Sequence, residues 1–241
     1  MSFASSAKLW LKQGETPLAR RLFTMAKHAR TFSVPCVRPL HKPLYSLHMG
    51  VRNGMADLVR IIWTTPLFKS RVSGSAKGLY LYSGLPVVLG PLEIELGDNV
   101  RLSGITTLTG RVSAKSTPFL KIGNGTGIGW QTTIAVGTRV VIGDNVHIAG
   151  RSFLAGYPGH PLDPEARAKG LPEHDDQCGD IIIEDNVWLA TGVTVMAGIT
   201  IGKGSVVAAG SVVTKDIPAG VLAGGMPAKV IRRIDGKHYD A

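Results

Sequence analysis

Residues 183–213 read IEDNVWLATGVTVMAGITIGKGSVVAAGSVV, and an aliphatic side chain returns there at every sixth position. The same period, with its phase reset at three breaks, covers fifteen positions: Leu96, Leu102, Leu108, Ile122, Ile128, Ile134, Ile142, Ile148, Leu154, Ile183, Leu189, Val195, Ile201, Val207 and Val213. A helix has about 3.6 residues per turn, so no face of it keeps an apolar stripe with a six-residue period. The pattern therefore excludes an amphipathic helix over this part of the chain.

Short strands joined at regular corners explain the period. Alternate side chains of a strand share a face, so each repeated residue and the small or β-branched residue four positions later point inward. The next residue is usually small, as at Gly97, Gly129 and Ala190, which permits a corner. The repeats predict an all-β parallel β-helix of roughly five coils over 96–218, after an imperfect coil at 72–95.

Composition agrees with an aliphatic core and many turns. The 241 residues are 44% hydrophobic and only 6% aromatic, with 30 Gly and 14 Pro. Two cysteines are too few for a disulfide framework or a cysteine-based zinc site. Arg60, Pro66 and Pro86 interrupt the longest apolar stretches before they reach membrane-spanning length. We expect a cytoplasmic protein that does not span the membrane.

The net charge of +10 lies entirely in residues 1–71. Thr16 and Pro17 predict the start of a basic amphipathic helix, and a second helix is expected at about 55–64, from Asn53 as cap to Pro66 as terminator. The prolines of residues 35–43 predict an extended linker between them. Two interpretations stay open: adhesion to an anionic membrane surface or an acidic carrier-linked substrate, and a helical cap with a solvated basic face.

The chain is thus expected to comprise a basic helical extension at 1–71, a β-helix at 72–234 and a tail at 235–241. Insertions near 111–119 and at 156–180 interrupt the repeats. The longer one carries polar residues together with His160 and His174, and a loop on a rigid scaffold is a natural place for chemistry.

Four runs carry a family resemblance: DNVWL at 185–189, AGSVVTKDIP at 209–218, GMPAKVIR at 225–232 and GHPLDP at 159–164. Together they resemble the hexapeptide-repeat O-acetyltransferases, above all those that acetylate maltose, galactosides, nodulation factors and exopolysaccharides. The resemblance covers about residues 72–234. It implies a left-handed parallel β-helix, a homotrimer, and acetyl transfer from acetyl-CoA to a hydroxyl of a sugar or of a polysaccharide or lipid-linked saccharide.

The resemblance also assigns residues. His160 would be the general base for direct attack on the thioester, a task that neutral imidazole suits near pH 7. Gln131 and Asp163 would help to bind the acceptor, although Gln131 stands where galactoside enzymes have an asparagine and is equally explained as an outward-facing strand residue. The matched coenzyme A contacts are Trp188, Thr191, Ala209, Thr214, Lys215, Lys229 and Arg232.

Three other functions compete with this one. A β-helical carbonic anhydrase would hold zinc with three histidines, and His147, His160 and His174 are present, but without a close pair. A non-catalytic β-helical scaffold is a second alternative. Nucleic-acid binding would fit a pI of 9.8, yet no recognition helix or aromatic-rich basic sheet is found. We expect no metal and no nucleic acid.

Overall fold

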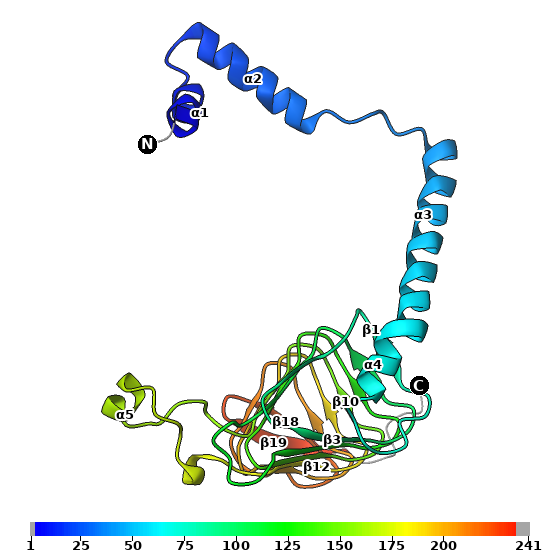
Figure 1. Cartoon of the computed structure of the whole chain (residues 1–241), viewed down its shortest axis with the longest axis vertical. Coiled ribbons are helices and arrows are strands. Elements are labelled where there is room, and N and C mark those ends of the chain that lie inside the picture. The colour runs from blue at the N-terminus through cyan, green and yellow to red at the C-terminus, as the bar shows by residue number, and fades with distance from the viewer. Residues whose placement is uncertain (1–2, 235–241) are drawn as a thin grey trace. The chain divides into compact units, whose positions relative to one another are not determined.

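The computed structural model describes residues 3–234, which form two compact units (Figure 1). The division falls between Gly54 and Met55, inside a helix. The predicted tail at 235–241 lies outside the described residues. None of the described helices is long and apolar enough to cross a membrane.

The first unit contains helices α1 (Phe3–Gln13), α2 (Pro17–Thr31) and most of α3 (Arg38–Val59). α2 begins where predicted: the Thr16 hydroxyl accepts a hydrogen bond from the Ala19 N–H at 3.1 Å, and Pro17 occupies the first turn. α1 packs against α2 and was not predicted. The only acidic side chain of this unit is that of Glu15.

The predicted linker at 35–43 and the predicted helix at 55–64 are both wrong in their bounds. α3 already starts at Arg38, so that Pro39 lies in its first turn and Pro43 in its interior, and Asn53 caps nothing. Pro66 does not end the helical segment either. A π-helix, η1 (Arg60–Thr64), intervenes, the Thr65 N–H donates to the Arg60 carbonyl, and Pro66 falls in the first turn of α4 (Thr65–Lys69).

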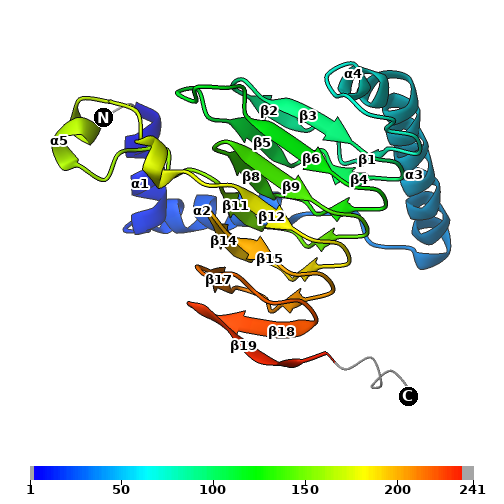
Figure 2. The same ribbon diagram turned by 90° about the horizontal axis from the view of Figure 1, so that it is seen from below.

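The second unit is a left-handed β-helix of three parallel sheets, with coils stacked as Figure 2 shows. The first sheet contains, in spatial order, β1 (Tyr80–Tyr82), β4 (Arg101–Ser103), β7 (Gly127–Ile128), β10 (His147–Ile148), β13 (Trp188–Leu189), β16 (Val206–Val207), β18 (Val221–Gly225) and the antiparallel β19 (Ala228–Arg233). The second contains β17 (Val212–Val213), β14 (Thr194–Met196), β11 (Phe153–Ala155), β8 (Thr133–Val136), β5 (Thr107–Gly110) and β2 (Val87–Leu89). The third contains β15 (Thr200–Ile201), β12 (Ile181–Ile183), β9 (Arg139–Ile142), β6 (Phe119–Ile122) and β3 (Glu93–Leu96).

All fifteen repeated aliphatic side chains lie in the core and are at most 2% exposed, which confirms the inward assignment. Parallel pairing aligns them from coil to coil, as in the row Leu102, Ile128, Ile148, Leu189 and Val207. Neighbouring coils also bond at the corners, where the Asp185 carboxylate accepts from the Asp144 N–H at 2.9 Å. Each coil therefore stabilises its neighbours along the stack.

Within this unit α4 covers the first coils. The Phe68 ring is 2% exposed and belongs to the β-helical core, and Arg71 donates to the Leu92 carbonyl at 2.7 Å. The segment next to the repeats thus contributes to the β-helical core, and the helical-cap interpretation of the basic helix after Thr16 stays a prediction. The predicted insertions separate β5 from β6 and β11 from β12; the longer one contains α5 (Pro164–Ala168) and the 3₁₀ turn η2 (Asp175–Gln177).

Candidate functional site

A hollow lies on the outer face of the first sheet of the second unit. We call it the sheet hollow; its volume is about 270 Å³ and it is lined by Tyr82, Arg101, Gly125, Gly127, Ile128, Gly129, His147, Ile148, Ala149 and Trp188. This volume is just below the ~300–1,000 Å³ of ordinary small-molecule pockets. The hollow therefore suits a ligand of about one sugar ring.

Strand register builds this hollow. Arg101, Gly127, His147 and Trp188 pair as neighbours on four adjacent strands, each beside an inward-pointing aliphatic residue. Because side chains alternate along a strand, all four lie on the outer face. Gly127 has no side chain, so it leaves a depression between Arg101 and His147, while the Trp188 indole forms a wall beyond His147.

An aromatic group holds the Arg101 side of the hollow. The Tyr80 ring has the Arg101 guanidinium 5.7 Å and the Arg60 guanidinium 4.7 Å from its centroid. The Tyr80 and Tyr82 rings stack with centroids 6.2 Å apart. The Tyr82 hydroxyl donates to the Ile128 carbonyl at 3.0 Å. Burial raises the pKa of Tyr82 despite the opposing charge of Arg101, so the phenol stays protonated and keeps donating at neutral pH.

His160 lies on the 156–180 insertion in an ordered turn. Gly159 has a φ of 79°, a left-handed conformation that favours glycine, which confirms the constrained turn before His160. After it, the Arg167 guanidinium donates to the carbonyls of Pro161 and Leu162, each at 3.0 Å. The peptide on both sides of His160 is thus held, while the imidazole itself is exposed.

Asp163, predicted to bind the acceptor, caps a helix. Its carboxylate accepts from the Ala166 N–H at 2.6 Å at the start of α5, with Pro164 in the first turn. In the GHPLDP run, Gly159 thus adopts the left-handed turn, the carbonyls of Pro161 and Leu162 accept from Arg167, and Asp163 and Pro164 start α5.

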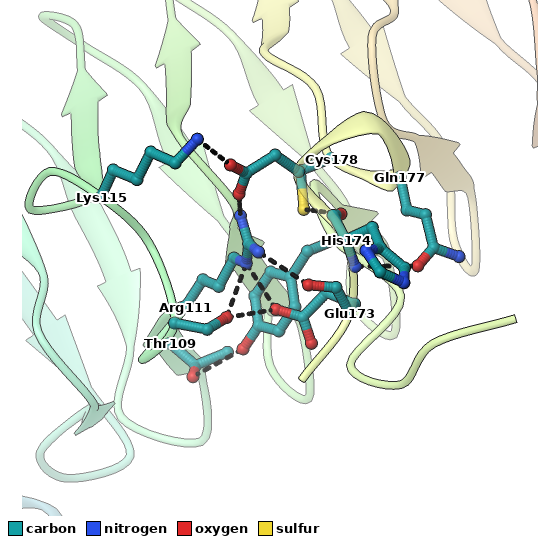
Figure 3. A network of polar contacts seen from close by, with 10 residues as sticks. Thr109, Arg111, Lys115, Glu173, His174, Gln177 and Cys178 are labelled. Atoms are coloured by element: carbon teal, nitrogen blue, oxygen red, sulfur yellow. Dashed lines mark hydrogen bonds and ion pairs between the residues drawn. The ribbon is translucent and has the colours of Figure 1, made fainter. Parts of the chain in front are cut away.

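A buried ion-pair network, which we call the loop clasp, ties the two insertions together (Figure 3). Arg111, next to β5, bonds the Glu173 carboxylate through Nε and the Asp175 carboxylate through Nη1, the latter at 2.7 Å. Ser113 donates to Glu173 at 2.7 Å, and Lys115 pairs with Asp175 at 2.6 Å. Arg111 and Glu173 are 3% and 7% exposed, so this pair is shielded from water.

The clasp shifts the protonation of its members. Burial by itself would raise the pKa of Glu173, but hydrogen bonds from Ser113, the backbone and Arg111 together hold it below the ordinary value. The pKa of Cys178 is raised chiefly because its thiol is partly buried. Glu173 therefore stays ionised well into the acid range, whereas Cys178 stays a neutral thiol at neutral pH.

The predicted coenzyme A contacts fall into two groups. Thr191 and Ala209 stand at one corner of consecutive coils, where the Gly210 N–H donates to the Thr191 carbonyl at 2.9 Å. Gln131 lies at the same corner two coils earlier; its amide oxygen accepts from Arg151 at 3.2 Å. The corner thus brings Gln131, Thr191 and Ala209 into one column, with Trp188, exposed and outward-facing as predicted, on the strand beside it.

The second group lies at the C-terminal end of the β-helix. Thr214 and Lys215 follow β17, and Lys229 and Arg232 lie on β19, where they pair with Gly224 and Leu222 of β18. All four of these side chains are exposed. Lys215, Lys229 and Arg232 thus place three exposed cations at the C-terminal rim, which would attract phosphate groups.

Within one chain the site residues do not all meet. His160 is not among the residues that line the sheet hollow. In residues 3–234 no group of three or more His, Cys, Asp and Glu side chains is placed to hold a metal ion, so His147, His160 and His174 do not form a zinc site there.

From the sequence we did not predict that Arg101, Tyr82 and His147 line a hollow. We also did not predict the ion pair between Arg111 and Glu173 in the loop clasp. The repeat itself held the first signal: Arg101, His147 and Trp188 each stand one position before a repeated aliphatic residue, where a side chain must point outward. The clasp gave no such signal, since its partners are 62 positions apart on two irregular loops.

The chain is similar to sugar O-acetyltransferases over a little under half its length. Galactoside O-acetyltransferase of Lactococcus lactis subsp. lactis is 44% identical over 113 residues, 46% of this chain and 49% of the relative. Polysialic acid O-acetyltransferase of Escherichia coli O1:K1 / APEC is 44% identical over 113 residues, 44% of this chain and 36% of the relative. The chain therefore spans half or less of the length of these curated relatives.

Structure and repeats agree with this similarity. A crystal structure of AntD, an N-acyltransferase from Bacillus cereus in complex with dTDP and 3-hydroxybutyryl-CoA, matches with a TM-score of 0.57 at 18% identity. The match covers 72% of this chain and 89% of that one and shows a shared fold. Residues 180–215 match the bacterial transferase hexapeptide family of six repeats. By its repeats, its fold and these relatives, the chain is similar to hexapeptide-repeat acetyltransferases over part of its length.

Proposed function

We propose that this protein transfers the acetyl group of acetyl-CoA to a hydroxyl of a saccharide. The observation that carries the proposal is the sheet hollow, an aromatic-walled cavity of about 270 Å³ in a chain whose relatives are named as sugar O-acetyltransferases. An indole face packs well against the apolar face of a sugar ring, and Arg101, His147 and Tyr82 supply polar groups for its hydroxyls.

His160 is the proposed general base. A sugar hydroxyl is a weak nucleophile at neutral pH, so the imidazole takes its proton as the oxygen attacks the thioester carbonyl. The new C–O bond gives a tetrahedral oxyanion, which a backbone amide stabilises. The C–S bond then breaks, and His160 returns the proton to the leaving thiolate of coenzyme A. No acyl-enzyme forms in this sequence.

The donor would lie along the Thr191 and Ala209 corner. A pantetheine arm fits a channel of small side chains and backbone groups, and its phosphates would meet Thr214, Lys215, Lys229 and Arg232 at the C-terminal rim. Coenzyme A derivatives are present in the AntD crystal structure, which has the same fold.

The active assembly is proposed to be a homotrimer. His160 does not line the sheet hollow of its own chain, and in the proposed assembly a second copy supplies this base. Gln131, at the edge of the hollow's sheet, and Asp163, near the base, would then contact the acceptor from two subunits. A mixture of His160→Ala and Trp188→Ala chains, unfolded and refolded together, should regain activity that neither variant has alone.

The decisive measurement is acetyl-CoA-dependent thiol release with a panel of sugars and glycosides. Release that requires both the sugar and His160 supports the proposal. Coenzyme A binding without any release would instead favour a non-catalytic β-helical scaffold. Zinc-dependent turnover that a chelator abolishes would favour the carbonic-anhydrase-like alternative.

The first unit is proposed to bring the enzyme to an anionic membrane surface, on the cytoplasmic side where acetyl-CoA is available. Between α1 and α2 lies a second cavity of about 280 Å³, the helix-pair hollow, with an apolar floor of Leu11, Phe23 and Ala26 and four cations, Lys8, Lys12, Lys27 and Arg30, around it. Apolar surface beside unbalanced positive charge is what an interfacial helix offers to acidic lipid. The acceptor would then be lipid-linked or a membrane-associated polysaccharide.

A further inference from the structure

The sheet hollow carries positive charge that no acidic side chain balances. None of its lining residues is an aspartate or glutamate. None of the ion pairs formed within residues 3–234 includes Arg101, whereas the nearby Arg60 pairs with Asp57 at 3.1 Å and Lys121 of the third sheet with Glu95 at 2.8 Å. The Arg101 guanidinium is thus a cation whose charge is available to whatever enters the hollow.

The surroundings of Arg101 keep that cation in place. Its guanidinium lies against the Tyr80 ring, and Arg60 occupies the same ring at the shorter distance of 4.7 Å, held in turn by Asp57. Tyr82 on the adjacent strand is fixed by its bond to the Ile128 carbonyl. A guanidinium that lies over an aromatic ring can still donate its N–H groups to an anion, because the ring forms no hydrogen bond with the N–H groups in the guanidinium plane.

The other walls suit a sugar ring rather than a bare anion. Trp188 is 50% exposed and stands two strands from Gly127, so one face of its indole is open. His147 between them offers a ring N–H, and Gly127, Gly129 and Ala149 leave the floor flat. The hollow therefore combines an apolar platform at one end with a guanidinium at the other, three strand spacings or about 14 Å away, so a ring on Trp188 reaches Arg101 through a charged substituent or through a second ring.

We propose that the sheet hollow selects a saccharide ring that bears a negative charge, a carboxylate or a phosphate, and that Arg101 is the residue that makes this selection. The inference rests on the proposed function for the site's role as acceptor site and adds the charge class of the acceptor. The names of the relatives leave that class open, since galactosides are neutral and polysialic acid is acidic. A guanidinium binds carboxylate and phosphate oxygens through two parallel N–H bonds, and a neutral hydroxyl gives no such charge-assisted pair.

The test measures binding without turnover. Full-length protein is titrated with the methyl glycoside of galacturonic acid and with methyl galactoside, by calorimetry or by saturation-transfer NMR, at low and at high salt. We expect the uronate to bind about tenfold or more tightly than the neutral glycoside, with a preference that shrinks as salt rises.

Three variants identify the source of the preference. Arg101→Gln should abolish it and Arg101→Lys should retain part of it. Lys121→Gln removes one charge from an exposed strand position outside the hollow and should leave it intact. Arg101 is exposed and bonds no other residue through its side chain except the Tyr80 ring contact, so the variants should fold; circular dichroism and gel filtration check this.

Coenzyme A is the other source of phosphate, so its affinity is measured for each variant. The inference holds if Arg101→Gln weakens the uronate and leaves coenzyme A unchanged. Equal affinity for the two glycosides, no binding of either, or an Arg101→Gln effect confined to coenzyme A would overturn it. Acetyl transfer is assayed separately. Transfer to the neutral galactoside without a charge preference supports the proposed function and contradicts this inference. Selective binding of the uronate without acetyl transfer supports this inference and contradicts the proposed function.

Discussion

Around His160, the peptide is held on both sides while the imidazole is free. Gly159 supplies the left-handed turn, Arg167 holds two carbonyls after it, and Asp163 caps α5. A side chain that does no structural work on such a fixed turn is available for chemistry. His147, by contrast, lies in the sheet hollow itself and is a rival candidate for the same proton transfer.

Replacing each histidine by alanine separates the two candidates. His160→Ala should lower kcat by about 10²–10⁴-fold with little change in coenzyme A affinity, because only the proton transfer is lost. His147→Ala should raise the KM of the acceptor and leave kcat within about tenfold, as expected of a wall residue. Steady-state kinetics with both substrates varied provide the measurement. The opposite pattern would make His147 the base.

At the scale of elements, the loop clasp decides whether the 156–180 insertion has one conformation. This insertion leaves the β-helix at β11 and returns at β12, with only short helical turns of its own. Arg111 anchors it from a different coil, and Glu173 is the residue on the insertion that meets this anchor. We therefore expect the Arg111–Glu173 pair to position His160 without touching it.

Removing the Glu173 charge should loosen the insertion. Glu173→Gln removes one of the two carboxylates that bond the buried Arg111 guanidinium, while Asp175 remains, so we expect a cost below the ~3–5 kcal/mol of a buried charge left without any partner. Trypsin cleavage after Arg167 and Lys169 should accelerate by about tenfold or more while the coils stay intact. Lys115→Gln is the matched control: that side chain is 87% exposed, so its ion pair with Asp175 contributes only about 0–1 kcal/mol. Equal cleavage rates in wild type and Glu173→Gln would show that the clasp does not hold the insertion.

The same pair gives the insertion a predictable pH dependence. The pKa of Glu173 is lower in the folded protein than in the unfolded chain, so its contribution to stability is complete above the ordinary glutamate pKa of about 4.3. It is lost as the pH falls below that value through the lower folded pKa. Hydrogen exchange of residues 156–180, corrected for intrinsic rates, should rise in that window in the wild type. In Glu173→Gln it should be fast at every pH; an identical pH profile in both proteins would contradict the assignment.

At the scale of the whole chain, local repeats were predictable and long-range contacts were not. All fifteen repeated aliphatic positions enter the core because each coil meets its neighbours in the same way, so one hexad predicts the next. Arg101 is linked to His147 only through pairings across 26 and 20 positions, and the insertion near 111–119 resets the phase of the repeat between them. The predicted helix bounds between residues 35 and 66 were wrong because Pro39 and Pro66 lie in the first turns of α3 and α4 and do not end a helix. The π-helix η1 also continues the helical segment from α3 into α4, past the expected end.

The first unit sets the last prediction, since residues 1–54 hold nine lysines and arginines against Glu15 alone. If the helix-pair hollow binds acidic lipid, full-length protein should float with vesicles of phosphatidylglycerol at low salt and much less at high salt. Replacing Lys8, Lys12, Lys27 and Arg30 together by glutamine should abolish flotation. The matched control replaces four exposed cations of the same unit outside the hollow, Arg21, Arg38, Lys42 and Arg52, and removes the same charge.

The two quadruple variants discriminate between a site and a general attraction. Each charge near an anionic surface contributes about 1 kcal/mol, so a diffuse electrostatic effect weakens both variants equally. A built site weakens the hollow variant far more, because only there do the cations surround an apolar floor into which an acyl chain can enter. Activity on a small soluble sugar should be unchanged in both variants, and activity on a lipid-linked acceptor should fall with flotation. If the intact protein does not float with the vesicles even at low salt, the membrane surface is not a partner of residues 3–54.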